Sequence, residues 1–179
     1  GILLYPFSVL LLILAFPARL DIAAAAWGIL AFGDGAATLA GRRFGRHRLP
    51  WNTDKSLEGL LAFVASGGAA AVFLAWWTAP AIAPPPAFAF VIMAPLLAAI
   101  AAGLVETVPI ALDDNISVPA SAAAVLWLGS LVTAAAWMSN RDAVAANLLP
   151  ALIVNTAAAT GGWLLRTVRV SGMIAGWAI

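Results

Sequence analysis

The sequence has no cysteine, a single histidine and very few charges. Without cysteine, disulfides, thiolate metal sites and cysteine nucleophiles are all excluded. Charged residues make up only 9% of the chain, against roughly 25% in ordinary globular proteins, whereas hydrophobic residues make up 64%. This composition indicates an integral membrane protein, and we expect no nucleic-acid partner.

Apolar stretches long enough to cross a membrane recur along the chain. A helix needs about 20 apolar residues to cross roughly 30 Å of hydrocarbon. The predicted fold class is therefore all-α, a polytopic transmembrane helix bundle with six complete spans and the start of a seventh near residue 171. The complete spans are expected near residues 1–17, 21–41, 58–79, 87–105, 118–138 and 144–164. Short breaks with turn residues separate them, among them the proline-rich segment 80–86 and "SNRDA" before the last span.

The cations are distributed unequally between alternate loops. One side of the membrane would hold Arg42, Arg43, Arg46, Arg48, Lys55, Arg166 and Arg169, and the other only Arg19 and Arg141. Because cations in short loops accumulate on the cytoplasmic side, we expect the first set to face the cytoplasm, in the cell inner membrane. The acidic segment 106–115 then opens to the same compartment, so the two polar segments are predicted to form one cytoplasm-facing site.

The segment "FGDGAATLAGRRFG" places an acid inside an apolar run. On a helix, Asp34, Thr38, Gly41, Arg42 and Gly45 share one face at spacings of three and four, with Asp34 about two turns from the expected helix end. Close helix packing of the small residues explains the glycines equally well, but it does not require a carboxylate. The neighbouring arginines satisfy the positive-inside rule, and one or two of them are candidates for phosphate contact.

The segment "WNTDKSLEG" leads into the third span. Either Asp54 or Ser56 can cap this helix, with Glu58 in its first turn. Lys55 is not explained by capping, because its cation opposes the positive end of the helix dipole. A lysine at this position indicates a neighbouring anionic ligand, such as a phosphate.

Carboxylates gather around the next cytoplasmic loop. Glu106 ends the fourth span, and Asp113, Asp114 and Asn115 precede the fifth. A solvated acidic turn is the alternative for one of the aspartates. Carboxylate and amide oxygens are the ligands that Mg²⁺ takes when it is shared with substrate phosphates. Cations for phosphates together with carboxylates for a metal are typical of phosphoryl or nucleotidyl transfer.

Three motifs in order, "GDGAATLAGRRFG", "KSLEG" and "ETVPIALDDNISVP", resemble the CTP-dependent polyprenol kinase family, which includes dolichol, phytol and farnesol kinases. A more distant similarity is to phosphatidate cytidylyltransferase. The resemblance covers roughly residues 1–140 and implies transfer of the γ-phosphate of CTP to the hydroxyl of an isoprenoid alcohol in the membrane. Leu60 departs from the pattern, because a serine is expected after "EG".

The resemblance implies the following roles, with Mg²⁺ as cofactor and CTP as co-substrate. Asp34, Lys55 and Glu58 are assigned to catalysis; Arg42, Arg43, Lys55, Ser56 and Asn115 to the nucleotide phosphates; and Glu106, Asp113 and Asp114 to the metal. Residues 141–179 are expected to form further spans, and their end, "LLRTVRVSGMIAGWAI", resembles the beginning of a second membrane domain of the type found in phytyl phosphate kinases. Because the sequence begins at Gly1 and stops within an apolar stretch, we expect a fragment of something longer.

Two other functions are compatible with parts of the sequence. A cytidylyltransferase would use nearly the same residues, but a further polar metal-binding signature is expected near a late span, where only Asn147, Asn155 and Thr160 occur. A transporter would place ionisable groups near the bilayer midplane at a repeat interface. Here the ionisable groups lie toward one membrane face, and no repeat is visible, so the kinase is preferred.

Overall fold

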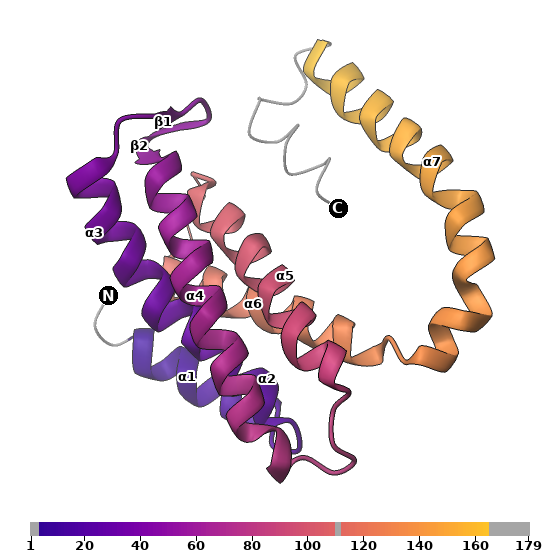
Figure 1. Ribbon diagram of the computed structural model, residues 1–179. Coiled ribbons are helices and arrows are strands. Elements are labelled where there is room, and N and C mark those ends of the chain that lie inside the picture. Colours follow the sequence, from indigo (N-terminus) through magenta and orange to yellow (C-terminus); the bar gives the residue numbers. More distant parts are fainter. Residues whose placement is uncertain (1–3, 110–111, 165–179) are drawn as a thin grey trace. The chain divides into compact units, whose positions relative to one another are not determined.

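The computed structural model describes residues 4–109 and 112–164, and they are mostly helical (Figure 1). In chain order the elements are α1 (Leu4–Ala15), α2 (Leu20–Gly28), a π-helical segment η1 (Ile29–Gly33), α3 (Asp34–Phe44), β1 (Arg48–Leu49), β2 (Asn52–Ser56), α4 (Leu57–Thr78), a 3-10 turn η2 (Ala79–Ala81), α5 (Phe88–Thr107), α6 (Asp114–Leu131) and α7 (Ala134–Leu164). The chain divides into two compact units, Gly1–Leu131 and Val132–Ile179.

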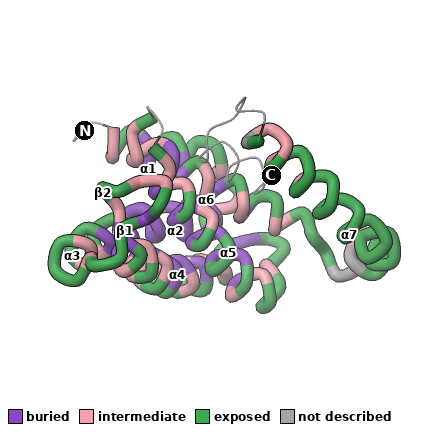
Figure 2. The backbone as a smooth tube through the Cα atoms, turned by 90° about the horizontal axis from the view of Figure 1, so that it is seen from above, coloured by how far each residue is buried: buried purple, intermediate pink, exposed green. Residues whose placement is uncertain are grey.

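The first unit is a helix bundle organised around α4. This helix packs against α2, α3 and α5, and α6 packs against α5, α2 and α1. Figure 2 shows buried residues where these helices meet. The fully buried positions include many alanines, such as Ala25, Ala26, Ala98 and Ala102, together with Phe63. Small side chains let helix backbones approach closely, which is how packing is achieved where lipid provides no hydrophobic drive.

Within residues 4–109 and 112–164, four helical stretches are long and apolar enough to cross a membrane, namely Leu20–Phe44, Leu57–Ala81, Phe88–Thr107 and Met138–Gly162. All six predicted stretches are largely helical, but α1 has only 12 residues, and α6 is not among the four. The prediction of six complete spans is therefore not confirmed. The coarser prediction of a helical membrane protein is confirmed. The predicted start of a seventh span near residue 171 lies outside the described residues.

The predicted break at "SNRDA" is wrong. Residues 139–143 lie inside α7, a continuous helix of 31 residues, and the chain is instead non-helical at residues 132 and 133. The reason is local: Ser139 Oγ and Asn140 Nδ2 donate to the carbonyl of Ala136 at 3.0 and 2.8 Å, inside the helix. The boundary of the first compact unit, after Leu131, also falls before the predicted domain boundary at 140, which stays a prediction.

Candidate functional site

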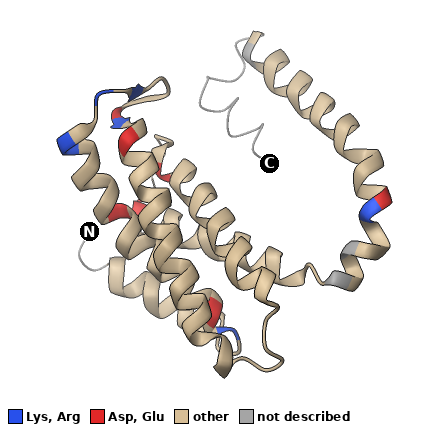
Figure 3. Cartoon of the chain, in the orientation of Figure 1, with Lys and Arg blue, Asp and Glu red and all other residues tan. Residues whose placement is uncertain are grey.

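The charged groups of the first unit gather at the end of the bundle that carries the β-hairpin (Figure 3). Within its described residues, Arg19 is the only cation outside the segment 42–55. It lies between α1 and α2, where its guanidinium pairs with Asp21 at 2.8 Å. At this end of the bundle, Lys55 and Glu106 form a hydrogen bond although they are 51 residues apart in the sequence.

The hairpin of β1 and β2 was not predicted from the sequence, and it is fixed to the end of α5. Trp51 Nε1 donates to Thr107 Oγ1 at 3.1 Å, and Asn52 Nδ2 donates to the Thr107 carbonyl at 3.0 Å. Thr107 is 1% exposed. The sequence indicated this anchor only through Trp51 and Asn52, which follow Pro50. Their partner, Thr107, could not be deduced from these residues.

β2 runs directly into α4, and of the two predicted caps the structure uses Ser56. Its Oγ accepts a hydrogen bond from the backbone N–H of Gly59 at 3.2 Å. Asp54 lies two residues earlier in the strand. This cap fixes the position of Lys55, the last residue before it.

Lys55 is the centre of the site. Its Nζ donates to Glu106 Oε1 on α5, and it lies 3.7 Å from Asp114 Oδ2 on α6. The Glu106 side chain is 5% exposed. Burial by itself would lower the pKa of Lys55, but the hydrogen bond and charge of Glu106, with the charges of Asp114 and Asp34, outweigh burial and raise this pKa above its ordinary value.

These contacts change the interpretation of Lys55. Its position before a helix N-terminus was taken as an indication of an anionic ligand. The structure provides two carboxylates of the protein itself as counter-charges. A lysine here is therefore compatible with a phosphate ligand but does not require one.

Asp34 lies beside the acidic loop, in a polar pocket of about 360 Å³ that we call the acid pocket. It is lined by Leu30, Asp34, Leu112, Asp113, Asp114 and Asn115. Asp113 Oδ1 accepts from the backbone and side-chain amides of Asn115 at 3.0 and 2.7 Å. The π-helical segment η1 ends immediately before Asp34; such segments interrupt α-helices frequently at functional sites.

A second cavity, of about 350 Å³, lies between α3, the hairpin and α4, and we call it the polar cleft. Its lining comprises Ala37, Thr38, Gly41, Arg42, Gly45, Arg48, Asp54, Lys55, Ser56, Gly59, Leu60 and Glu106. Four of the five residues predicted to share one helix face line this cleft, and the fifth, Asp34, lines the acid pocket. Lys55 connects the two cavities, because it lines the cleft and contacts Asp114. Leu60, where a serine was expected, gives the cleft an apolar side chain.

Both explanations proposed for the glycines apply. A Cβ built on Gly59 would lie 3.2 Å from the Ala37 carbonyl oxygen and 3.6 Å from Gly41 Cα. The backbones of α3 and α4 therefore approach closely at this point. Gly41 and Gly59 also line the polar cleft. They therefore allow the two helices to pack closely and leave backbone exposed to the cleft.

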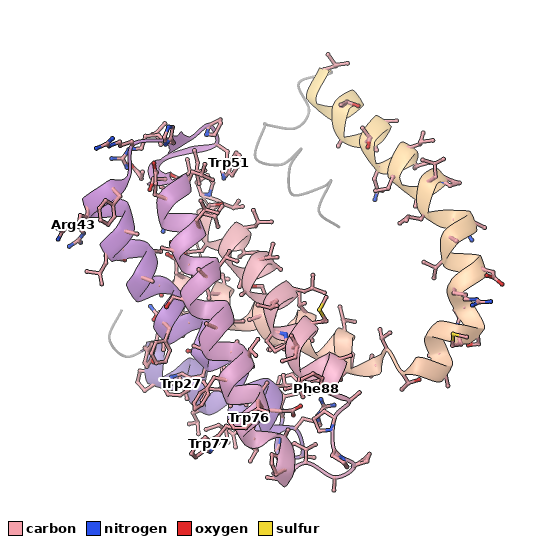
Figure 4. All side chains as sticks on the ribbon, viewed as in Figure 1. Trp27, Arg43, Trp51, Trp76, Trp77 and Phe88 are labelled. Atoms are coloured by element: carbon pink, nitrogen blue, oxygen red, sulfur yellow. The ribbon has the colours of Figure 1, made fainter. Side chains whose placement is uncertain are left out.

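Two predicted site residues are not brought to either cavity. Arg43 lies on the outer side of α3 (Figure 4), with its guanidinium 5.6 Å from the centre of the Phe44 ring. Glu58 reaches back to His47, whose Nδ1 lies 2.6 Å from Glu58 Oε1 and whose backbone N–H donates to the same carboxylate at 3.3 Å. Glu58 thus holds the entry of the hairpin, and His47, the single histidine of the sequence, is its partner.

The acids do not form a metal cage by themselves. Among the residues that the structure describes, no three histidine or acidic side chains lie close enough to hold a metal ion. Glu106 and Asp114 are both oriented to Lys55. Mg²⁺, however, is usually held by one or two carboxylates together with substrate phosphates and water. The hard oxygen donors of the acid pocket fit that shared kind of site.

Comparison with known proteins finds similarity to plant enzymes. The chain is 33% identical over 102 residues to "Farnesol kinase, chloroplastic" of Arabidopsis thaliana, covering 52% of this chain and 31% of that protein. It is 36% identical over 116 residues to "Probable phytol kinase 2, chloroplastic" of Oryza sativa subsp. japonica, covering 58% and 33%. With "Probable phytol kinase, chloroplastic" of Triticum aestivum, the identity is 32% over 134 residues, covering 72% and 43%.

The chain thus spans about a third to under a half of the length of these relatives. No family model matches the chain, and no solved structure matches it significantly. The similarities bear out the resemblance found in the three motifs. They do not show a relation to phosphatidate cytidylyltransferase and do not favour that alternative.

Proposed function

We propose, on the premise that the chain is homologous to the phytol and farnesol kinases, that it transfers the γ-phosphate of CTP to the hydroxyl of an isoprenoid alcohol. The observation that carries this proposal is the position of Lys55. It joins a cleft lined by cations and open backbone to a pocket lined by carboxylates. Phosphoryl transfer needs both surfaces, because catalysis of this reaction consists mainly of positioning and charge stabilisation.

The polar cleft is proposed to bind the nucleotide phosphates. Arg42 and Lys55 supply positive charge, and Ser56 begins α4, whose N-terminal backbone favours anions. Gly41, Gly45 and Gly59 leave the backbone uncovered, which allows a phosphate to approach it. Arg48, which was not predicted for this role, lines the same cleft. Asn115 is proposed to bind phosphate from the acid pocket.

The acid pocket is proposed to receive the hydroxyl group of the acceptor. Its oxygen attacks the γ-phosphorus, the bond from that phosphorus to the bridging oxygen of the β-phosphate breaks, and the nucleoside diphosphate leaves. Asp34 accepts the hydroxyl proton in this scheme. Lys55 stabilises the phosphate charge from the cleft side, and Glu106 holds the lysine ammonium in place.

Mg²⁺ is proposed as the cofactor, held by Asp113, Asp114 and Glu106 together with the nucleotide phosphates, where it would offset the charge on the transferring group. The donor chemistry supports this proposal, although Glu106 is bonded to Lys55. Metal binding through Glu106 would therefore require that hydrogen bond to lengthen.

The membrane arrangement is likewise proposed. Six complete spans in a bundle, with the hairpin and the segment 106–115 on the cytoplasmic side of the cell inner membrane, place the site at the cytoplasmic face. Two observations support this arrangement: the cations gather at the hairpin end, and four helices have spanning length and composition. The acceptor would then enter from the lipid and the nucleotide from water.

Product analysis with CTP labelled separately at the α and γ positions tests the reaction. Membranes holding the full-length protein are incubated with phytol, farnesol, a long polyprenol, diacylglycerol or phosphatidate, with ATP as the competing nucleotide. Label from the γ position in an alcohol product, with release of CDP, is expected. Label from the α position in the lipid, with release of pyrophosphate, would overturn the proposal.

A further inference from the structure

An apolar groove of about 350 Å³ runs between α1 and α6, and no step of the proposed reaction uses it. It is lined by Ser8, Leu11, Leu12 and Ala15 of α1, by Phe16 directly after that helix, and by Ile116, Pro119, Ala120, Ala123 and Ala124 of α6. Each set repeats at intervals of three and four residues, so each helix presents one continuous face to the groove. The α6 face is made mainly of alanine, whose small side chain leaves the space open.

The groove offers no free polar group to a ligand. Its single hydroxyl, Ser8 Oγ, donates to the carbonyl of Tyr5 at 2.8 Å. Ala120 and Ala124 are exposed. Along α6, the helix rises about 12 Å from Ile116 to Ala124. An occupant must therefore be an elongated apolar chain rather than a polar or charged molecule.

On α6 the groove begins where the acid pocket ends, because Asn115 lines the acid pocket and the next residue, Ile116, lines the groove. Asp113 lies three residues before Ile116, and its backbone carbonyl accepts hydrogen bonds from the N–H groups of Ile116 and Ser117 at 2.9 and 3.1 Å. Ile116, Ala120 and Ala124 follow one another at intervals of four on one side of α6, and the carboxylates of the acid pocket, Asp113 and Asp114, precede them in the chain. A molecule lying along this side would have its polar end at the acid pocket and its apolar chain between α1 and α6.

We propose that the α1–α6 groove binds the isoprenoid chain of the acceptor alcohol and sets which chain lengths are used. This inference rests on the proposed kinase function and adds the position of the hydrocarbon to it. A chain held along Ala124, Ala120 and Ile116 directs its terminal hydroxyl toward the pocket of Asp34 and Asp113. The small alanines then determine how much of the chain is accommodated.

Filling the groove tests the proposal. Ala120→Leu and Ala124→Leu, each in the full-length protein, add bulk at exposed positions. The readout is the ratio of kcat/KM for farnesol to kcat/KM for a single-isoprene alcohol, which should fall by about tenfold or more in both variants, the range that apolar pocket contacts provide. Ala69→Leu, at an exposed position of α4, is the matched control and should leave the ratio unchanged. An unchanged ratio in both groove variants would overturn the proposal.

Photolabelling provides a readout that is independent of turnover. A farnesol analogue with a diazirine at the end of its chain should label peptides containing residues 8–16 and 116–124, and excess farnesol should prevent the labelling. Labelling on another helix pair, by a protein that phosphorylates farnesol, would overturn the groove and leave the kinase proposal intact. A wild-type protein that phosphorylates none of the isoprenoid alcohols, phytol and the long polyprenol included, would overturn the kinase function, and with it this inference.

Discussion

Lys55 connects the hairpin, α5 and α6 through its contacts with Glu106 and Asp114. We expect Lys55→Met to abolish phosphoryl transfer, because in the proposed reaction the lysine ammonium stabilises the charge of the transferring phosphate. The measurement is the initial rate of CTP-dependent phosphorylation of farnesol. Retention of near-normal activity would remove Lys55 from the site.

The stability of this variant needs a control, because Glu106 would lose its partner inside the bundle. An unpaired buried polar group costs about 1–3 kcal/mol, and more if it is charged. The double variant Lys55→Met with Glu106→Gln should unfold closer to the wild type than Lys55→Met alone, yet stay inactive. Recovery of activity in the double variant would mean that the lysine acts only through folding.

The direction of the Lys55 pKa shift determines how its contribution to stability depends on pH. Its folded-state pKa is raised above 10.5, so the stabilisation from its charge is fully present below the unfolded value and is lost only as the pH rises through the raised value. Between about pH 6 and 9 we therefore expect no alkaline loss of activity from this group. A loss in that range that disappears in Lys55→Arg would contradict this assignment.

Asp34 is the residue proposed to accept the proton of the alcohol. Asp34→Asn keeps the shape of the side chain but removes the base, and kcat should fall by about 10²–10⁴-fold, the usual contribution of general-base catalysis. CTP binding, followed by the thermal shift that the nucleotide causes, should be retained. Asp142→Asn, at a side chain 94% exposed on α7, is the matched control and should be neutral. Equal losses in both variants would contradict the role.

At the scale of elements, the contact of α3 with α4 depends on glycine at one position. Gly59→Ala places a Cβ 3.2 Å from the Ala37 carbonyl and 3.3 Å from Ser56 Oγ, so the helices must separate slightly. We expect a loss of about 1–3 kcal/mol in the free energy of unfolding, as in other overpacked sites. The measurement is unfolding of the purified protein in mixed micelles.

Gly35 lies on α3, one of the same two helices, and Gly35→Ala is expected to have the opposite effect on stability. No atom lies within 4 Å of a Cβ built there, so the change should add about 0.5–1 kcal/mol of stability through the helical preference of alanine. Equal destabilisation by both substitutions would show that glycine matters for the helices themselves and not for the approach of α3 to α4.

Elements also show where pattern analysis fails. The hairpin of residues 48–56 is mostly polar after Trp51 and lacks the alternation that identifies strands, and it is anchored by hydrogen bonds to Thr107 on α5. The "SNRDA" segment has turn composition, yet its serine and asparagine bond back into α7. In both cases the partner of the side chain, and not its type, decides the local structure.

At the scale of the whole molecule, membrane orientation can be tested directly because the chain has no cysteine. Single substitutions Arg46→Cys and Leu112→Cys should react with a membrane-impermeant maleimide only after the cell membrane is opened. Ala83→Cys, in the loop before α5, should react in intact cells. The reason is the excess of cations at the hairpin end.

The aromatic residues fit the same orientation. Figure 4 shows Trp51 at the hairpin end, and Trp76, Trp77 and Phe88 toward the opposite end of the bundle, as expected for side chains at the two membrane interfaces. Labelling of Arg46→Cys and Leu112→Cys from opposite sides would contradict a single site. Labelling of all three positions from the same side would contradict the span count between them.

The sequence by itself determined the membrane class, the helical composition and the residues that carry charge near one end of the bundle. Hydropathy and charge are properties of consecutive residues, and the cost of a charge in hydrocarbon is high enough to restrict where it occurs. Asp34, Lys55, Glu106 and the 113–115 cluster were identified for this reason.

Only the tertiary structure decided how these residues are paired. Lys55 bonds to a glutamate 51 positions away, Glu58 turns to His47, and the α1–α6 groove is formed by two helices a hundred residues apart. Such pairings depend on which helix faces meet, and this is settled by close packing of alanine and glycine along whole helices. No local pattern of residue types contains that information.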